Sequence, residues 1–190
     1  MNLPNYARRR GLAIGLAASV STLLPLKAAW GQTTGFAPRD WLAQIRQHHD
    51  LIDRSFEELL SPNERSFEQV ALHVRTLDQL QTAHSMAEEN LIYPALARIG
   101  MMQEAEKLYM DEAHMKMQKA QVELAVGLNQ QNANWREPAT RLRGMMQRHT
   151  RQDEEQRLFP ELQRRLGPEE NARLAQRYVA EFSRVLPVRP

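Results

Sequence analysis

The histidines are the residues of this sequence whose type and spacing could do chemistry. Five of the six recur in step with the apolar residues of amphipathic segments: His49, His73, His84, His114 and His149. An imidazole buried in an apolar core without a partner costs a few kcal/mol. Repeating that cost along the chain is reasonable only if the rings share a partner. A metal ion is the simplest one, because neutral imidazole ligates iron, copper and zinc.

Carboxylates accompany two of these histidines. His84 and Glu88 are four residues apart, so both side chains lie on one face of a helix and can reach one centre. His149 is followed by Asp153, Glu154 and Glu155. A carboxylate from each of two facing helices is what a bridged pair of metal ions needs. Because the chain has no cysteine, any metal here is held by nitrogen and oxygen.

The two segments also share an ending. The stretch Glu88-Glu89-Asn-Leu-Ile-Tyr93-Pro94 corresponds to Glu154-Glu155-Gln-Arg-Leu-Phe159-Pro160, so each reaches a proline six residues after a glutamate. This shared spacing distinguishes the acids from an ordinary solvated helix face.

Four long amphipathic helices must position these groups. Apolar residues recur in steps of three and four over residues 40–60, from Ser61 or Ser66 to Pro94, over residues 101–128 and over residues 137–159. Gly167-Pro168 begins a last, shorter helix. The short connections predict an all-α fold: an antiparallel up-down-up-down four-helix bundle with a short extra C-terminal helix.

Each long predicted helix has a face that we expect to point inward. On the first, this face is Leu42, Ile45, His49, Ile52, Phe56 and Leu59. On the third, it is Met110, His114, Met117, Gln121, Leu124 and Leu128. On the last, shorter helix, Leu174, Tyr178 and Phe182 share one face.

The first 31 residues indicate a cleavable export signal. Three arginines at positions 8–10 precede an apolar run over residues 11–26 that is short for a bilayer span. The arginines are similar to a twin-arginine signal, with an ordinary secretory signal as the alternative. Small residues at Ala29 and Gly31 place cleavage before Gln32. We therefore expect a periplasmic or otherwise exported protein that uses the twin-arginine export machinery and has no stable membrane span after cleavage.

The predicted organisation is a signal over residues 1–31, a linker over 32–38, the bundle over 39–167, and the C-terminal helix and tail over 168–190. The signal holds four of the 25 basic residues and none of the 23 acidic ones, which leaves 21 basic and 23 acidic residues in the mature chain. This near balance gives no basic surface for nucleic acid, so we expect no nucleic-acid partner.

Together these residues resemble the hemerythrin family, in particular its HHE cation-binding branch, over about residues 40–167. Four pieces carry the resemblance: His49-Asp-Leu-Ile52-Asp53-Arg54, His84 to Pro94, Glu112-Ala-His114, and His149 to Pro160. The resemblance implies a four-helix bundle with a carboxylate-bridged centre of two non-haem iron ions, or another divalent metal. The ligands it implies are His49, His84, Glu88, His114, His149 and Glu154.

The chain departs from that family in the third helix. Oxygen-carrying hemerythrins have two histidines four apart there, whereas the neighbours of His114 at that spacing are Met110 and Gln118. Simple oxygen carriage is therefore not expected.

For two of the ligand positions, the sequence offers alternative residues. A straight helix would favour Asp153 to share the face of His149, but the distance to Pro160 favours Glu154. His73 and His84 are about 16 Å apart along a helix axis and cannot serve one site. We prefer His84 because it has the carboxylate. His48, His73, Glu89 and Asp153 stay as weaker candidates.

The predicted function is the binding or reduction of a small ligand such as dioxygen, nitric oxide or peroxide, or the sensing or buffering of iron. Whether it is an enzyme stays open. The alternatives are an iron-storage or ferroxidase-type protein and a metal-free structural bundle.

Overall fold

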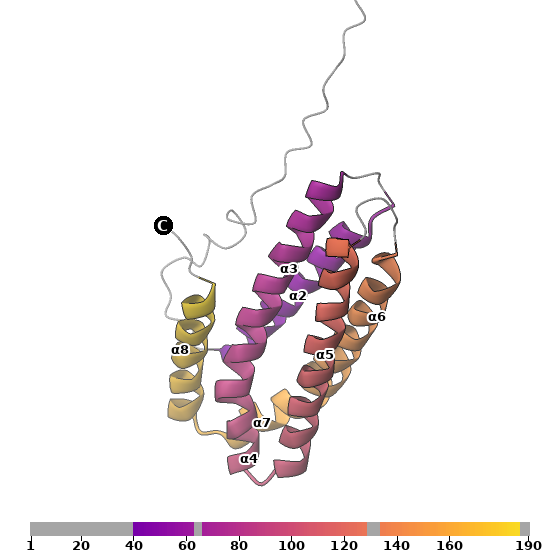
Figure 1. The fold of residues 1–190 in the computed structure, drawn as a ribbon. Coiled ribbons are helices and arrows are strands. Elements are labelled where there is room, and N and C mark those ends of the chain that lie inside the picture. The colour runs from indigo at the N-terminus through magenta and orange to yellow at the C-terminus, as the bar shows by residue number, and fades with distance from the viewer. Residues whose placement is uncertain (1–39, 63–65, 129–133, 187–190) are drawn as a thin grey trace, which may run out of the picture.

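The computed structural model describes residues 40–62, 66–128 and 134–186, and all regular secondary structure in these ranges is helical (Figure 1). The predicted export signal and the linker lie outside the described residues. No helix within the described ranges is long and apolar enough to cross a membrane.

Four long helical units make up the bundle. The first is α2 (Trp41–Leu60). The second is α3 (Phe67–Ala87), which continues through the π-helix η1 (Glu88–Ile92) into α4 (Tyr93–Arg98). The third is α5 (Met102–Leu128). The fourth is α6 (Arg136–Gln147), which continues through the π-helix η2 (Arg148–Leu158) into α7 (Phe159–Arg165).

Local sequence explains where these units begin and turn. Of the two possible starts for the second unit, Ser66 is the one used: its side chain accepts from the backbone of Gln69, whose own side chain accepts in return. Ser61 instead ends α2. Gly100 has φ of 87°, a left-handed conformation that glycine adopts without a Cβ clash, and it closes the turn before α5.

The four units pack in a ring around one core. Helix α2 packs against α3 and α6, and α5 packs against α3 and α6. The predicted inward face of α2 is confirmed, since each residue predicted to form that face is buried: Leu42, Ile45, His49, Ile52, Phe56 and Leu59. Apolar burial of this kind stabilises the fold by about 25 cal/mol per Å².

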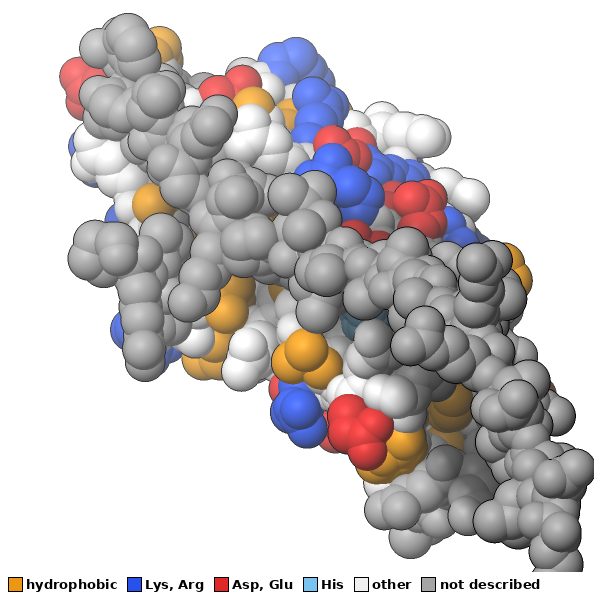
Figure 2. Space-filling view, turned by 90° about the horizontal axis from the view of Figure 1, so that it is seen from above, with side chains coloured by type: hydrophobic (Ala, Val, Ile, Leu, Met, Phe, Trp, Pro, Cys, Tyr) orange, Lys and Arg blue, Asp and Glu red, His pale blue; other side chains and the backbone are white. Residues whose placement is uncertain are grey.

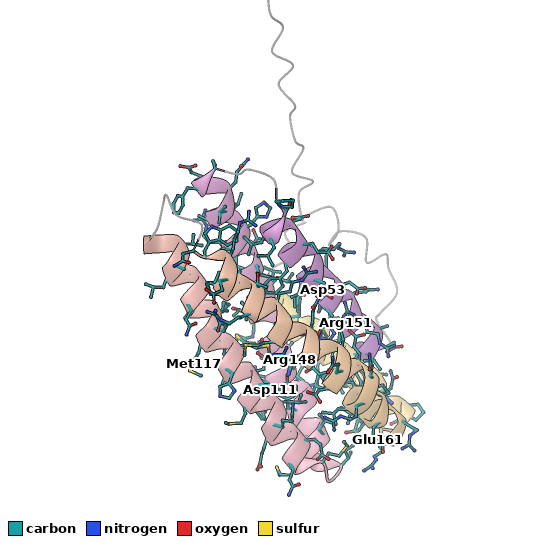
Figure 3. All side chains as sticks on the ribbon, turned by 90° about the vertical axis from the view of Figure 1, so that its right-hand side faces the viewer. Asp53, Asp111, Met117, Arg148, Arg151 and Glu161 are labelled. Atoms are coloured by element: carbon teal, nitrogen blue, oxygen red, sulfur yellow. The ribbon has the colours of Figure 1, made fainter. Side chains whose placement is uncertain are left out.

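The predicted inward face of α5 is wrong. Met110, Met117 and Leu124 are 59%, 58% and 60% exposed, and Met117 projects from the outer side of α5 in Figure 3. The face that is buried comprises Ala105, Leu108, Glu112, Met115, Val122 and Val126. Helix α5 has apolar residues at helical spacing on both sides, so periodicity alone could not identify the inner one.

The last helix, α8 (Pro168–Val185), packs outside the ring. It contacts α3, α2 and η1, and Figure 1 shows it beside α3, away from α5 and α6. The residues predicted to share one of its faces, Leu174, Tyr178 and Phe182, are buried. This helix therefore covers one side of the bundle only.

Charges of both signs are interspersed on the described surface. Figure 2 shows basic side chains lying beside acidic ones on part of the described surface. On the face drawn in Figure 3, Arg151 pairs with Asp53 at 2.7 Å.

Candidate metal centre

Two π-helical turns lie at the level of the candidate ligands. The backbone N–H of Tyr93 donates to the carbonyl of Glu88, and that of Phe159 donates to the carbonyl of Glu154, five residues back in each case. Pro94 and Pro160 follow directly and have no N–H to donate, so the regular i−4 pattern is interrupted at these points anyway. The repeated phrase in the sequence thus forms a repeated local structure.

The π-turn decides which acid of the fourth unit faces inward. In a π-helix the bonded spacing is five residues, so Glu154 shares the face of His149. Glu154 is buried, whereas Asp153 stays partly exposed and pairs with Lys107 at 2.7 Å and Arg157 at 2.6 Å. A straight α-helix would have given the opposite arrangement.

Six side chains from all four units meet in the core. His49, His84, Glu88 and Glu154 form one group whose candidate ligand atoms all lie within 4.8 Å of one another. Glu88, Glu112 and His149 form a second group by the same measure. Glu88 belongs to both groups, so the two possible metal positions are neighbours.

The second carboxylate of the pair also lies between the two groups. Glu154 Oε2 is 3.3 Å from His49 Nε2, and Glu154 Oε1 is 3.0 Å from His149 Nε2. Glu88 Oε2 is 3.3 Å from His84 Nε2. Both glutamates of the repeated phrase are therefore placed to bridge.

Each imidazole turns Nε2 toward the cluster and Nδ1 toward a polar neighbour. His49 Nδ1 lies 2.6 Å from Glu155 Oε1, His84 Nδ1 lies 3.2 Å from the Tyr178 hydroxyl, and His149 Nδ1 lies 3.6 Å from Asp111 Oδ2. Glu155 and the Tyr178 hydroxyl are partners of the kind that orient metal-binding histidines and fix the tautomer that leaves Nε2 free to ligate. His149 Nδ1 has no hydrogen-bond partner among the described residues.

The cluster contains buried carboxylates that no described basic side chain fully neutralises, and carboxylate oxygens that no described group of the protein hydrogen-bonds. Glu88, Glu112 and Glu154 are at most 1% exposed. Glu88 Oε1, Glu112 Oε1 and Glu154 Oε2 are buried without a hydrogen-bond partner. The Nε2 atoms of His49 and His84 face each other at 3.1 Å. Cations placed between these atoms would satisfy all of them, so the residues fit a pair of metal ions.

Without a cation, protons must offset this charge. Burial opposes protonation of His49, but the neighbouring carboxylates of Glu154, Glu155 and Glu88 overcome it and raise its pKa to about 10. Burial and the charge of Glu154 raise the pKa of Glu88 to about 8. Burial and repulsion from His49 lower the pKa of His84 well below its usual value. The metal-free cluster thus holds protons at neutral pH.

The structure does not bring His114 to the cluster. It is exposed on the outer side of α5, while Glu112, two residues earlier, takes the inward position. Sequence reasoning did not select Glu112 as a ligand. Its spacing from Leu108 and Met115 was the available signal, because steps of four and three place it on their face.

The weaker candidates also lie outside the two groups. His48 stacks on Phe182, with ring centroids 3.8 Å apart, and its Nδ1 is 2.9 Å from the Tyr178 hydroxyl. His73 lies 3.7 Å from Glu58. Glu89 pairs with Lys116 at the surface.

A cavity of about 270 Å³ between α3 and α5 reaches the centre. Its wall includes the thioethers of Met86, Met115 and Met146, and Glu112 lines it directly. The Ser85 hydroxyl, also in the wall, donates to Glu112 Oε2 at 2.7 Å.

A second cavity, of about 250 Å³, lies on the other side of α5 and is lined by His149 and His114. Small molecules therefore have space beside the second group of ligands.

No family model, curated protein or solved structure matches this chain. The chemistry of the site therefore has to be argued from its own residues.

Proposed function

We propose that this chain is an exported, hemerythrin-like protein that holds two non-haem iron ions and binds or reduces a small ligand such as dioxygen, nitric oxide or peroxide. One observation carries the proposal: two buried groups of nitrogen and oxygen donors share Glu88. A shared carboxylate offsets the repulsion between two close cations.

The donors divide between two positions. His49 and His84 serve the first position, and Glu112 and His149 serve the second. Glu88 and Glu154 lie between them. Nitrogen and oxygen donors without thiolate suit iron, and bound iron supplies the capacity to bind a small ligand and to exchange electrons with it.

The residues of the chain contribute access and confinement. The cavity lined by Glu112 admits a molecule of a few atoms to the second position, and its thioether walls give that molecule a largely apolar surrounding. On the opposite side, α8 covers α2 and α3. The proposal thus places ligand entry on the α5 side.

Two further parts of the proposal concern the chain as a whole. Short connections, such as the turn at Gly100, support an up-down-up-down order of the four units. Export through the twin-arginine route would suit a protein that folds around its metal first, because that route carries folded proteins.

Metal analysis of matched variants tests the proposal. Purified protein should hold two irons per chain. Glu88→Gln should hold fewer than two, because it removes the shared carboxylate, while Glu89→Gln, one residue away and paired with Lys116 at the surface, should keep both. Reduced protein should then react with at least one of dioxygen, nitric oxide and peroxide. Equal metal content in the two variants, or no bound metal in the wild type, would refute the proposal.

A further inference from the structure

The hydroxyl of Tyr93 lies among the candidate ligand atoms. Tyr93 is fully buried and is the first residue of α4, directly after the π-turn of η1. Its oxygen is 3.0 Å from Glu154 Oε1, 3.1 Å from His149 Nε2 and 3.3 Å from Glu88 Oε2. Three of its neighbours are therefore donors of the proposed centre.

These distances are those expected between ligands of one ion. Donor atoms bonded to a metal at about 2.1 Å and at right angles to each other stand about 3.0 Å apart. The ligand atoms already proposed for the centre show the same separations: His149 Nε2 to Glu154 Oε1 is 3.0 Å, and His84 Nε2 to Glu88 Oε2 is 3.3 Å. The Tyr93 oxygen fits the same shell.

The second position is also the one with fewer imidazoles. Among the described residues, the first group contains His49 and His84, whereas the second contains His149 as its one histidine. The Tyr93 oxygen adjoins Glu88 and His149 of that second group, and it meets His149 at Nε2, the ring atom turned toward the metal position.

A comparison of the two copies of the repeated phrase distinguishes the role of the Tyr93 ring from that of its hydroxyl. Phe159 occupies the place of Tyr93 in the fourth unit, is equally buried, and packs its ring against Trp41 with centroids 5.7 Å apart. A phenyl ring therefore suffices to build the turn before the proline. The oxygen of Tyr93 is not explained by packing.

We propose that Tyr93 is a phenolate ligand of the metal at the second position, beside His149 and Glu112. This inference rests on the proposed function. On binding, the phenol O–H bond breaks, an oxygen–metal bond forms, and the proton leaves to solvent with those released by the other ligands. No electron is transferred in this step.

Visible absorption and resonance Raman spectra of the iron(III)-loaded protein test the assignment. A phenolate bound to iron(III) gives a charge-transfer band in the visible and enhanced ring vibrations. Both should be present in the wild type and lost in Tyr93→Phe. Tyr109→Phe is the matched control, because its hydroxyl donates to the Glu89 carbonyl and contacts no carboxylate of the cluster. That variant should keep both signals.

The outcomes separate this inference from the proposal it rests on. Two bound irons without phenolate signals, or signals that survive Tyr93→Phe, overturn the ligand assignment and leave the two-iron centre standing. Absence of iron from the wild type overturns both. If Tyr93→Phe fails to fold, the double variant Tyr109→Phe, Tyr178→Phe, loaded to the same iron content as the wild type, decides. Retained phenolate vibrations there support Tyr93, and their loss refutes it.

Discussion

At the residue scale, the proposed centre is a set of ionisable groups for which protons and metal ions would compete. His49, with a pKa of about 10, and Glu88, with a pKa of about 8, are both protonated at pH 7 in the absence of metal. Their ligating atoms are the same atoms that carry those protons. Loading the centre must therefore displace protons into solution.

We predict that metal binding at pH 7 releases several protons per chain, from His49, Glu88, His149 and the Tyr93 phenol, and tightens as pH rises from 7 toward 10. The sign follows from linkage, because the metal-free state binds more protons than the loaded state, so lower proton activity favours loading. Calorimetric titration in two buffers of different ionisation enthalpy measures the number released. Binding without proton release would contradict the protonation states given above.

A second prediction concerns the ligand from the third unit. Glu112→Gln should reduce bound iron from two to about one per chain, because Glu112 serves the second position alone. His114→Ala should keep two irons, since His114 is exposed on the other face of the same helix. Iron analysis of the two purified variants makes the comparison. The reverse result would restore His114 as the ligand.

The sequence predicted some donors and not others for physical reasons. A histidine and a glutamate four apart, as in His84 and Glu88, share a face in any straight α-helix. Glu112 was missed because an acid beside Asp111 resembles a solvated helix face. Tyr93 was seen only as part of a repeated phrase, since a buried tyrosine at helical spacing is usually core.

At the element scale, α8 reaches the centre through one hydroxyl. The Tyr178 oxygen lies 3.2 Å from His84 Nδ1 and 2.9 Å from His48 Nδ1. Burial and the nearby charge of His49 lower the pKa of His48 to about 3, so His48 is neutral and its Nδ1 can accept from Tyr178. Tyr178 can then accept from the Nδ1–H of His84. This chain of hydrogen bonds fixes the ring of His84, which would ligate a metal at the first position.

We predict that Tyr178→Phe weakens metal binding about 10- to 100-fold, the usual effect of removing a group that orients a ligand. The fold should survive, because phenylalanine keeps the ring packing and loses one hydrogen bond worth about 1 kcal/mol. Competition with a chelator measures the affinity. Tyr109→Phe, which removes a surface hydroxyl bonded to the Glu89 carbonyl, should change it little. Equal affinities in both variants would show that α8 does not support the centre.

The π-turns show where periodicity fails as a guide to elements. A constant angle of about 100° per residue places Asp153, and not Glu154, over His149. The extra residue in the turn reverses that choice, and only the equal distance of Glu88 and Glu154 from a proline indicated it in advance. On α5 no such second signal was available, and the predicted face was wrong.

At the scale of the whole molecule, the centre ties all four units together. His49 comes from α2, His84 from α3, Glu112 from α5 and His149 from η2. A metal bound there would link elements far apart in the chain, because the complete set of ligands exists only in the folded state.

We predict that removing the metal lowers the melting temperature by about 5–10 °C. Free metal at 100 times its dissociation constant stabilises the folded state by about 2.7 kcal/mol, and a chain of this size shifts by about 2–4 °C per kcal/mol. Calorimetric scans with and without a chelator measure the difference. In Glu88→Gln the same treatment should produce a smaller shift. A chelator that leaves the wild-type melting temperature unchanged would count against a centre that spans the bundle.

The overall architecture followed from the sequence more closely than the site did. Four amphipathic segments and a fifth, shorter one were predicted and are present, because the apolar period of a buried helix face repeats many times along each segment. A ligand, by contrast, is a single residue whose position can shift with one extra residue in a turn.

The sharing of Glu88 between two unlike sets of donors has a consequence for assembly. One set contains two imidazoles, His49 and His84, and the other contains one, His149, together with Glu112. Metals differ in their preference for nitrogen over oxygen, so the two positions must differ in affinity for any given ion. Loading should then proceed in order, nitrogen-rich position first, with a single-metal species at substoichiometric supply. Such a chain could also accommodate two different metals, each in the position that suits it.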